Sequence, residues 1–187
     1  MDKIFQQAVC DFYRRTQKGT LLIHNNYGEP DEMPLDVYLR GNDDLSDLEI
    51  YALQLCQGKI LDVGAGLGAL TMILQSQGKA VEALEISPRF CAIMSERGIS
   101  RVRQGDFMDW KVNRQYDTIL MMMNGFGLCG YYQQLPDLFK ALERHLAPGG
   151  QILFDSSDIS YLYDGNNKPG DRYFGEMDYQ YEYAGKL

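Results

Sequence analysis

The fold of this sequence is decided by the stretch Lys59-Ile60-Leu61-Asp62-Val63-Gly64-Ala65-Gly66-Leu67-Gly68-Ala69-Leu70-Thr71. An apolar run, alternating glycines and a helical pattern predict a buried strand that turns sharply into a helix. Glycine lets the backbone bend and approach a ligand where a Cβ atom would collide with it. Because such a turn exposes N–H groups of the helix N-terminus, we expect a site for an anion or a polar ligand edge above it.

Length and composition indicate one soluble globular domain. The chain has 187 residues, of which 45% are hydrophobic and 24% are charged, as in proteins with one buried core. Its formal net charge of −8 opposes binding to a phosphate backbone, so we expect no nucleic-acid partner. The N-terminus lacks the pattern of a signal peptide, and no run reaches the roughly 18 apolar residues of a membrane span. We therefore expect a cytoplasmic protein with no membrane partner.

The cysteines do not form a metal or redox motif. Cys10, Cys56, Cys91 and Cys129 lie far apart, without a Cys-x-x-Cys pair, which argues against a zinc knuckle or a redox site. We interpret them as buried apolar thiols and expect no bound metal.

Downstream of the turn, the sequence repeats a strand followed by a helix. Ser87 and Pro88 are typical of a helix N-terminus, and Pro148-Gly149-Gly150 is expected to stop a helix over residues 133–146. The further predicted strands cover residues 80–86, 101–104, 116–123 and 151–154. This alternation indicates a doubly wound, mostly parallel α/β sheet with right-handed crossovers and helices on both faces.

The residues before the turn predict an N-terminal helical cover. Apolar residues at helical spacing predict a helix over residues 3–17. Residues 20–44 contain scattered glycines and prolines, which predict an ordered but irregular connector. Ser46-Asp47-Leu48-Glu49 is a capping-box pattern and predicts a helix that Gly58 ends.

Beyond Asp158 the alternation of strands and helices ends. Tyr179, Tyr181 and Tyr183 alternate with polar residues, which predicts a strand with one aromatic face. This strand pairs within the sheet or with a second copy in a homo-oligomer, unless the chain is a fragment. We predict a single domain over residues 1–187 in three parts: the N-terminal helix and cover (1–44), the core (45–158) and an incomplete C-terminal part (159–187).

The glycine turn alone is compatible with two classes of cofactor. Gly64-x-Gly66-x-x-Ala69 satisfies the dinucleotide pattern, and Glu85 lies about 20 residues further on, where an acid binds the ribose. Asp62 separates the two interpretations, because a pyrophosphate gains nothing from a second negative charge before the turn. An acid at this position suits a ligand that carries positive charge.

Asp62-x-Gly64-x-Gly66-x-Gly68 resembles the first motif of class I S-adenosylmethionine-dependent methyltransferases. Glu85 resembles the acid that holds the ribose hydroxyls, and Gly105-Asp106-Phe107 resembles the segment that meets the adenine amine and lines its pocket. Tyr116-Asp117 and residues 146–153 resemble the fourth and fifth strands. The resemblance covers roughly residues 45 to 158 and implies a Rossmann-like sheet with the core order 3-2-1-4-5.

The resemblance implies S-adenosylmethionine as the cofactor and S-adenosylhomocysteine as the product. Asp62 is expected to face the amino acid end of the cofactor, and Asp106 to accept from the adenine amine. Arg40, in the N-terminal cover, is expected to pair with the cofactor carboxylate. The cofactor-binding residues expected in all are Asp62, Gly64, Ala65, Gly66, Glu85, Ile86, Asp106, Phe107, Asn124 and Arg40.

The resemblance further implies methyl transfer to a small-molecule acceptor by in-line attack. No catalytic base is evident, because His24 lies in the connector and His145, near a helix C-terminus, favours a structural role. Tyr27, Tyr38 and the tyrosine-rich end are candidates to shape the acceptor pocket. Alignment of the methyl donor and the acceptor can supply much of the rate of methyl transfer. The lack of an evident base is therefore no argument against an enzyme.

Two alternatives stay open. Family members usually add two more strands after the fifth, and the sequence has residues for only part of them, so one alternative is a non-catalytic module that binds S-adenosylmethionine or a partner. The other alternative is an NAD-dependent oxidoreductase, which the dinucleotide pattern allows.

Overall fold

The computed structural model describes residues 1–25, 28–163, 170 and 172–187. They form two compact units: Val37–Ser156, here called the core unit, and Met1–Asp36 with Ser157–Leu187, here called the terminal unit. Within the described ranges, every helix is too short or too polar to span a membrane.

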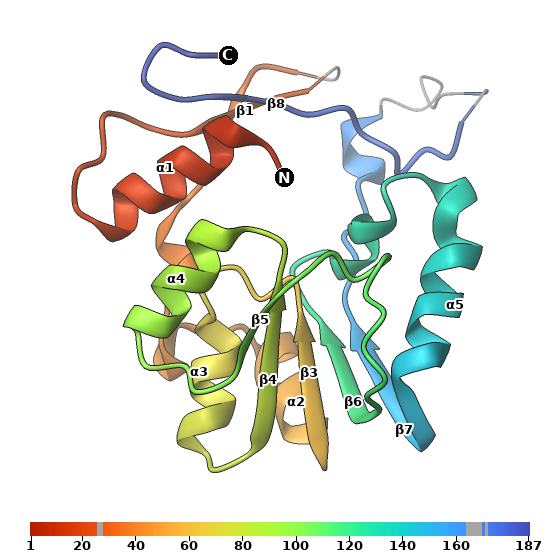
Figure 1. Ribbon diagram of the computed structural model, residues 1–187. Coiled ribbons are helices and arrows are strands. Elements are labelled where there is room, and N and C mark those ends of the chain that lie inside the picture. Colours follow the sequence, from red (N-terminus) through yellow and green to blue (C-terminus); the bar gives the residue numbers. More distant parts are fainter. Residues whose placement is uncertain (26–27, 164–169, 171) are drawn as a thin grey trace. The chain divides into compact units, whose positions relative to one another are not determined.

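The core unit is built on a five-stranded parallel sheet in the order β5-β4-β3-β6-β7 (Figure 1). In chain order this is 3-2-1-4-5, with parallel pairing throughout. The predicted fold class and strand order are therefore confirmed. The strands are β3 (Lys59–Val63), β4 (Ala80–Glu85), β5 (Val102–Gln104), β6 (Tyr116–Met121) and β7 (Leu146–Phe154).

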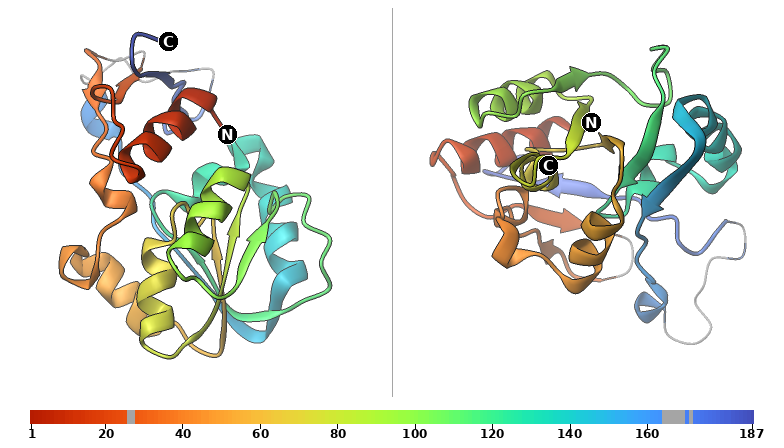
Figure 2. Two further views of the ribbon diagram at one scale, coloured as in Figure 1. Left: turned by 60° about the vertical axis from the view of Figure 1, so that its left-hand side comes forward. Right: turned by 90° about the horizontal axis from the view of Figure 1, so that it is seen from below.

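Helices cover both faces of this sheet, as predicted (Figure 2). Side chains alternate along a strand, so Ile60 packs with α2 and α3 on one face while Leu61 packs with α5 on the other. The helices are α2 (Asp47–Leu55), α3 (Ala69–Ser76), α4 (Pro88–Glu96) and α5 (Leu135–His145), with short 3-10 turns η1 (Asp36–Tyr38), η2 (Asn42–Asp44), η3 (Gly125–Cys129) and η4 (Tyr132–Gln134).

Local sequence signals start the core helices where they were predicted. Ser46 and Glu49 form the reciprocal capping box of α2, and the Ser87 hydroxyl caps α4 with Pro88 at its first turn. Each signal acts within one helical turn, so the chain needs no distant contact to set these boundaries.

The helix predicted over residues 133–146 is confirmed, whereas the strand predicted over residues 151–154 begins earlier and includes Pro148-Gly149-Gly150. Helix α5 ends at His145, and strand β7 begins at the next residue and contains the whole segment. The β6–β7 register shifts there, which makes the segment a bulge in the strand. A Cβ on Gly150 would lie 2.9 Å from the Ala147 carbonyl oxygen, so the bulge itself requires a glycine at this position.

The terminal unit joins both ends of the chain in one antiparallel sheet of order β2-β1-β8. Strand β1 (Leu22–His24) pairs with β2 (Asp31–Glu32) and with β8 (Gln180–Glu182). The predicted C-terminal strand is confirmed, and its partner is β1. The prediction that residues 20–44 are irregular is wrong for β1 and β2, because strands of two or three residues show too little alternation to detect.

Helix α1 (Lys3–Tyr13) packs against β8 within the terminal unit. The ring centroids of Phe5 and Tyr181 are 5.2 Å apart, and Tyr183 is 3% exposed. The helix ends before residue 17, the predicted end. The unit also contains the 3-10 turn η5 (Ser160–Leu162).

The four cysteines are free thiols, and only some of them are fully buried. Cys10 and Cys56 are buried, whereas Cys91 and Cys129 are half-buried. Burial raises the pKa of both the Cys56 and the Cys91 thiol to about 11. These two groups are therefore protonated and unreactive near neutral pH.

Candidate functional site

The glycine turn between β3 and α3 is held by its own hydrogen bonds. Gly64, Gly66 and Gly68 all have positive φ angles. The N–H groups of Gly64 and Ala65 both donate to the Leu84 carbonyl oxygen, at 2.9 and 3.1 Å. The prediction that the turn offers free N–H groups to an anion is therefore wrong for these two residues, because the backbone of β4 already uses them.

Asp62 lies at the end of β3 and is buried under the turn. It is 4% exposed, and the Thr71 hydroxyl in the first turns of α3 donates to its Oδ2 at 2.5 Å. Burial raises the pKa of Asp62 to about 6, although the Thr71 hydrogen bond opposes this shift. A positively charged group placed nearby would favour the ionised form of this carboxyl.

Glu85 ends β4 and joins this strand to the glycine turn. Its Oε2 accepts from the Gly66 N–H at 2.9 Å, and its Oε1 accepts from the Ser87 N–H at 2.8 Å. It is 2% exposed, and burial raises its pKa against the effect of these N–H donors. Each carboxylate oxygen can accept a further hydrogen bond, for example from a ligand hydroxyl. The two backbone N–H groups therefore fix Glu85 in position without using all of its acceptor sites.

The residues beside Glu85 and after β5 differ in exposure. Ile86 is 41% exposed and offers an apolar face. Asp106 is exposed, and its Oδ1 accepts from the Met108 N–H at 3.0 Å in a local turn. Phe107 is 4% exposed and packs in the core, 5.7 Å from the His145 ring. Ile86 and Asp106 are therefore exposed to solvent, whereas Phe107 is buried in the core.

The segment after β6 has a strained backbone. Met123 and Asn124 both have φ of +61°, which is uncommon for residues other than glycine and clusters at functional sites. The Asn124 N–H donates to Asp155 Oδ1, at the end of β7, at 2.8 Å. Sequence reasoning missed Asp155, whose signal is an acid directly after the fifth apolar strand.

Tyr38, at the end of η1, lies close to the glycine turn, whereas Arg40 contacts α2. The Tyr38 ring would lie 3.5 Å from a Cβ on Gly66. Arg40 Nη2 forms an ion pair with Glu49 Oε1 on α2, a contact that the sequence does not predict. The sequence also does not predict the contacts of Arg97, whose Nη1 donates to the carbonyl oxygens of Leu67 and Tyr38. Tyr27 lies outside the described residues.

Each histidine has its polar partners within its own unit. In the terminal unit, His24 Nε2 is 2.8 Å from Glu182 Oε2 and links β1 to β8. In the core unit, His145 is 2% exposed, with its ring nitrogens 3.1 and 3.2 Å from the carbonyl oxygens of Trp110 and Arg114. The structural role predicted for His145 is confirmed, because it holds the segment between β5 and β6.

The sheet order and the acids that end β3 and β4 define a Rossmann-like methyltransferase domain. A family model described as "Methyltransferase domain" matches residues 60–150. A solved S-adenosylmethionine-dependent methyltransferase from Bacteroides fragilis, in complex with S-adenosyl-L-homocysteine, is 36% identical with a TM-score of 0.86. The match covers 98% of this chain and 76% of that one. The chain belongs to the S-adenosylmethionine-dependent methyltransferases.

Curated relatives share shorter segments. The cypemycin N-terminal methyltransferase of a Streptomyces species is 28% identical over 102 residues, 53% of this chain and 42% of that protein. The trans-aconitate 2-methyltransferase of Mycobacterium tuberculosis is 38% identical over 96 residues, 50% of this chain and 35% of that protein. The chain thus spans less than half of the length of these two relatives.

Proposed function

We propose that this protein transfers a methyl group from S-adenosylmethionine to a small-molecule acceptor. The observation that carries the proposal is the pair of buried acids, Asp62 and Glu85, at the carboxyl ends of β3 and β4 beside the glycine turn. The cofactor has a sulfonium and an ammonium against one carboxylate, so its net positive charge complements these acids.

The glycine turn disfavours the dinucleotide alternative. The N–H groups of Gly64 and Ala65 are taken by the Leu84 carbonyl, and the N–H of Gly66 is taken by the Glu85 carboxylate. A pyrophosphate at this turn would find these three donors engaged and an acid beside them.

Each candidate residue has a role that fits its environment. Glu85 would accept from the ribose hydroxyls, and Ile86 and Asp106 would contact the adenine through an apolar face and a carboxylate. Phe107 would shape the adenine pocket from the core side. The methionine part would lie along Asp62, Gly64, Ala65, Gly66, Asn124 and Arg40.

The acceptor would approach the rim after β6 and β7. Asn124 and Asp155 supply polar groups there, and the rings of Phe126 and Phe154 lie 4.0 Å apart beside them. In the transfer the acceptor lone pair bonds to the methyl carbon, the C–S bond electrons stay on sulfur, and any acceptor proton leaves to water. The net charge of −8 supports a small-molecule acceptor over a nucleic acid.

We also infer a cytoplasmic location, one functional domain and association of copies through β8. Strand β8 ends the sheet order β2-β1-β8, so it has an edge without a partner strand in the described sheet. Such an edge can pair with a second copy.

Calorimetric titration with S-adenosylmethionine, S-adenosylhomocysteine and NAD tests the cofactor. Glu85→Ala should weaken binding of the first two by roughly 10- to 150-fold, which is about 1.5 to 3 kcal/mol for hydrogen bonds to a charged group. Glu143→Ala removes an exposed acid from α5 and should leave affinity unchanged. Binding of NAD alone would overturn the proposal.

Product analysis tests the transfer itself. The protein is incubated with S-adenosylmethionine and a panel of amines, carboxylic acids and short peptides, and methylated products are identified by mass spectrometry. Methylation of a small acceptor supports the proposal. Cofactor binding without product from any acceptor would indicate a non-catalytic module. Methylation of the peptides alone would show that the acceptor is a peptide and not another small molecule.

A further inference from the structure

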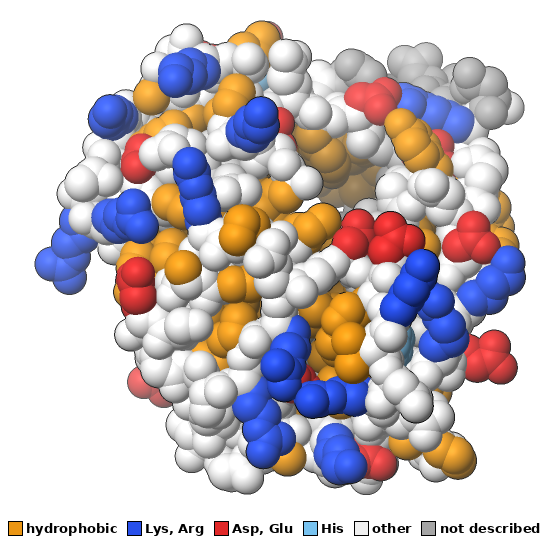
Figure 3. Space-filling view, in the orientation of Figure 1, with side chains coloured by type: hydrophobic (Ala, Val, Ile, Leu, Met, Phe, Trp, Pro, Cys, Tyr) orange, Lys and Arg blue, Asp and Glu red, His pale blue; other side chains and the backbone are white. Residues whose placement is uncertain are grey.

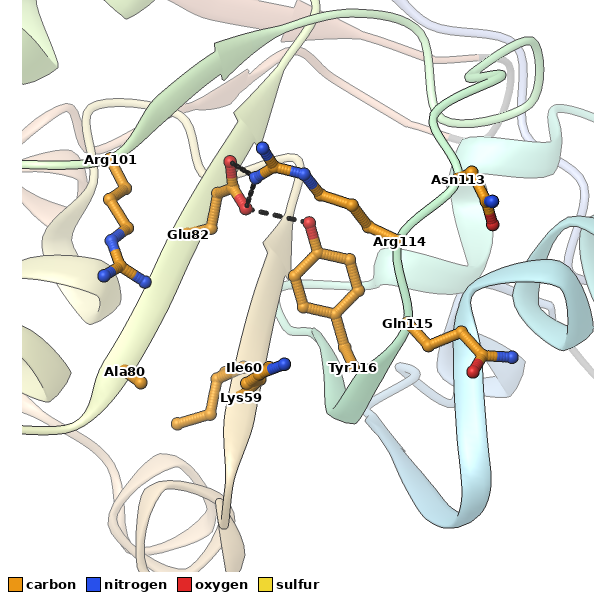
Figure 4. Close-up of a pocket in the computed structure, with 9 residues that line it drawn as sticks. All are labelled: Lys59, Ile60, Ala80, Glu82, Arg101, Asn113, Arg114, Gln115 and Tyr116. Atoms are coloured by element: carbon orange, nitrogen blue, oxygen red, sulfur yellow. Dashed lines mark hydrogen bonds and ion pairs between the residues drawn. The ribbon is translucent and has the colours of Figure 1, made fainter.

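A pocket lies at the amino end of the core sheet, whereas Glu85 lies at the carboxyl end of β4. Its volume is about 500 Å³, and it is lined by the first residues of β3, β4 and β6 and by the segments that precede β5 and β6 (Figure 4). This volume is typical of pockets that hold small molecules.

The pocket exists because one connection in the sheet lacks a helix. Residues 105–115, all described, join β5 to β6 through turns and loop instead of a helix. On β4, Leu84 packs into the core cluster shared with α5, and Glu82, two residues earlier, faces the same side. Within the described part of the chain, no helix covers this side of β4 at Glu82, and Glu82 is among the residues that line the pocket.

Glu82 is already satisfied by protein groups. It is 5% exposed, and it accepts from the Tyr116 hydroxyl at 2.9 Å, from Arg114 Nη1 at 3.1 Å, and from Arg103 Nε. Burial opposes its charge, but the hydrogen bonds from Arg103 and Tyr116 and the two guanidinium charges together lower its pKa. Glu82 therefore holds Arg114 at the pocket. Its negative charge is compensated by the two guanidinium groups, so it does not repel an anion strongly.

Two further cations at the pocket have no protein partner. Among the residues that the structure describes, neither the Lys59 ammonium nor the Arg101 guanidinium makes a hydrogen bond or an ion pair. The nearby Asp117 carboxylate accepts from the Lys59 backbone N–H at 2.7 Å. The lining has three cations and one carboxylate, a formal surplus of two positive charges in a chain of charge −8.

The surface view shows the same gathering of charge. In Figure 3, lysine and arginine side chains lie over the lower part of the core sheet, beside a patch of hydrophobic side chains. In an acidic protein, a local surplus of positive charge concentrates anions at that place.

We propose that this pocket binds a phosphorylated small molecule, with Lys59, Arg101 and Arg114 holding its phosphate oxygens. Guanidinium groups match phosphate through two parallel N–H bonds, and an ammonium acts as a compact point charge. Arg114 is oriented for this contact by Glu82, and Tyr116 keeps Glu82 in place. The site does not rest on the methyltransferase function, since it shares no residue with the glycine turn.

Titration of the full chain with inorganic pyrophosphate, followed by calorimetry, tests this site. We expect one pyrophosphate per chain, with Arg101→Gln and Lys59→Gln each weakening binding by about tenfold or more. Lys140→Gln is the matched control, because it removes one positive charge from α5 where the side chain is 73% exposed. Its affinity for pyrophosphate should equal that of the wild type.

Several results would overturn the proposal. The first three are no binding of pyrophosphate, equal weakening by all three variants, and displacement of pyrophosphate by S-adenosylhomocysteine. Equal weakening would show that pyrophosphate responds to the overall charge of the protein and not to this pocket. Displacement by S-adenosylhomocysteine would show that pyrophosphate binds at the glycine turn. Citrate binding as tightly as pyrophosphate would contradict the assignment to phosphate. Unfolding of each variant in urea confirms that the exposed substitutions leave the fold intact.

Discussion

The contact between the glycine turn and α4 allows a quantitative test of the fold. Gly68 has φ of +77°, and a Cβ built on it would overlap Ile99 Cδ1 and lie 3.1 Å from Met94 Cγ. Gly68→Ala therefore carries a left-handed backbone cost of about 1 to 2 kcal/mol and an overpacking cost of about 1 to 3 kcal/mol. We expect the free energy of unfolding to fall by about 2 to 5 kcal/mol.

Two further variants separate these costs. Gly78 has φ of +75°, and no atom lies within 4 Å of the place that an added Cβ would take, so Gly78→Ala should carry the backbone cost alone. Ile99→Val removes the Cδ1 atom that the new methyl would strike. By itself it should cost about 0.5 to 1.5 kcal/mol, but in the Gly68→Ala background it should restore part of the lost stability.

Urea unfolding followed by tryptophan fluorescence measures the wild type, the three single variants and the double variant. The chain has one tryptophan, Trp110, which is 8% exposed in the core cluster and thus reports on the core unit. Equal losses in Gly68→Ala and Gly78→Ala, or no recovery in the double variant, would refute the packing of the turn against α4.

Three other variants probe polar side chains that take part in hydrogen bonds. Because burial raises the pKa of Asp62 from 3.8 to about 6, the folded state binds more protons between these values, and stability should fall by about 3 kcal/mol as pH rises through them. Asp62→Asn should flatten this part of the curve, and an unchanged slope would contradict the shift. Tyr116→Phe removes a donor to buried Glu82 and should cost about 1.5 to 3 kcal/mol, unlike the exposed control Tyr131→Phe. Asp155→Ala removes the acceptor of the Asn124 N–H, so hydrogen exchange at this amide should accelerate. An unaltered exchange rate would argue against that bond.

The parts of the fold that the sequence predicts are those specified within a few residues. Ser46 and Glu49 cap α2 through a contact that spans one turn, and Ser87 with Pro88 starts α4 in the same way. Apolar strands that alternate with helices leave few topologies, because crossovers in parallel sheets are right-handed. The strand order therefore follows from the pattern together with the family resemblance.

The parts that the sequence does not predict depend on distant partners. Strand β1 is recognisable only once β8 pairs with it, and the two paired residues His24 and Glu182 are 158 positions apart in the chain. Pro148-Gly149-Gly150 forms a bulge because β6 lies beside it, whereas its local preference is to end a helix. Likewise, nothing near Asn124 in sequence indicates that Asp155 holds its backbone.

The capping box of α2 also makes an ion pair that its sequence pattern does not reveal. Glu49 Oε2 accepts from the Ser46 N–H at 3.0 Å, and its Oε1 pairs with Arg40. Arg40 Nε is buried and has no hydrogen-bond partner among the described residues, and a buried donor left in this state costs about 1 to 3 kcal/mol. The cofactor carboxylate would supply an acceptor under the proposed function. Under that proposal, the ion pair with Glu49 would hold Arg40 for the contact, and the Glu49 carboxylate would serve both the helix cap and the cofactor site.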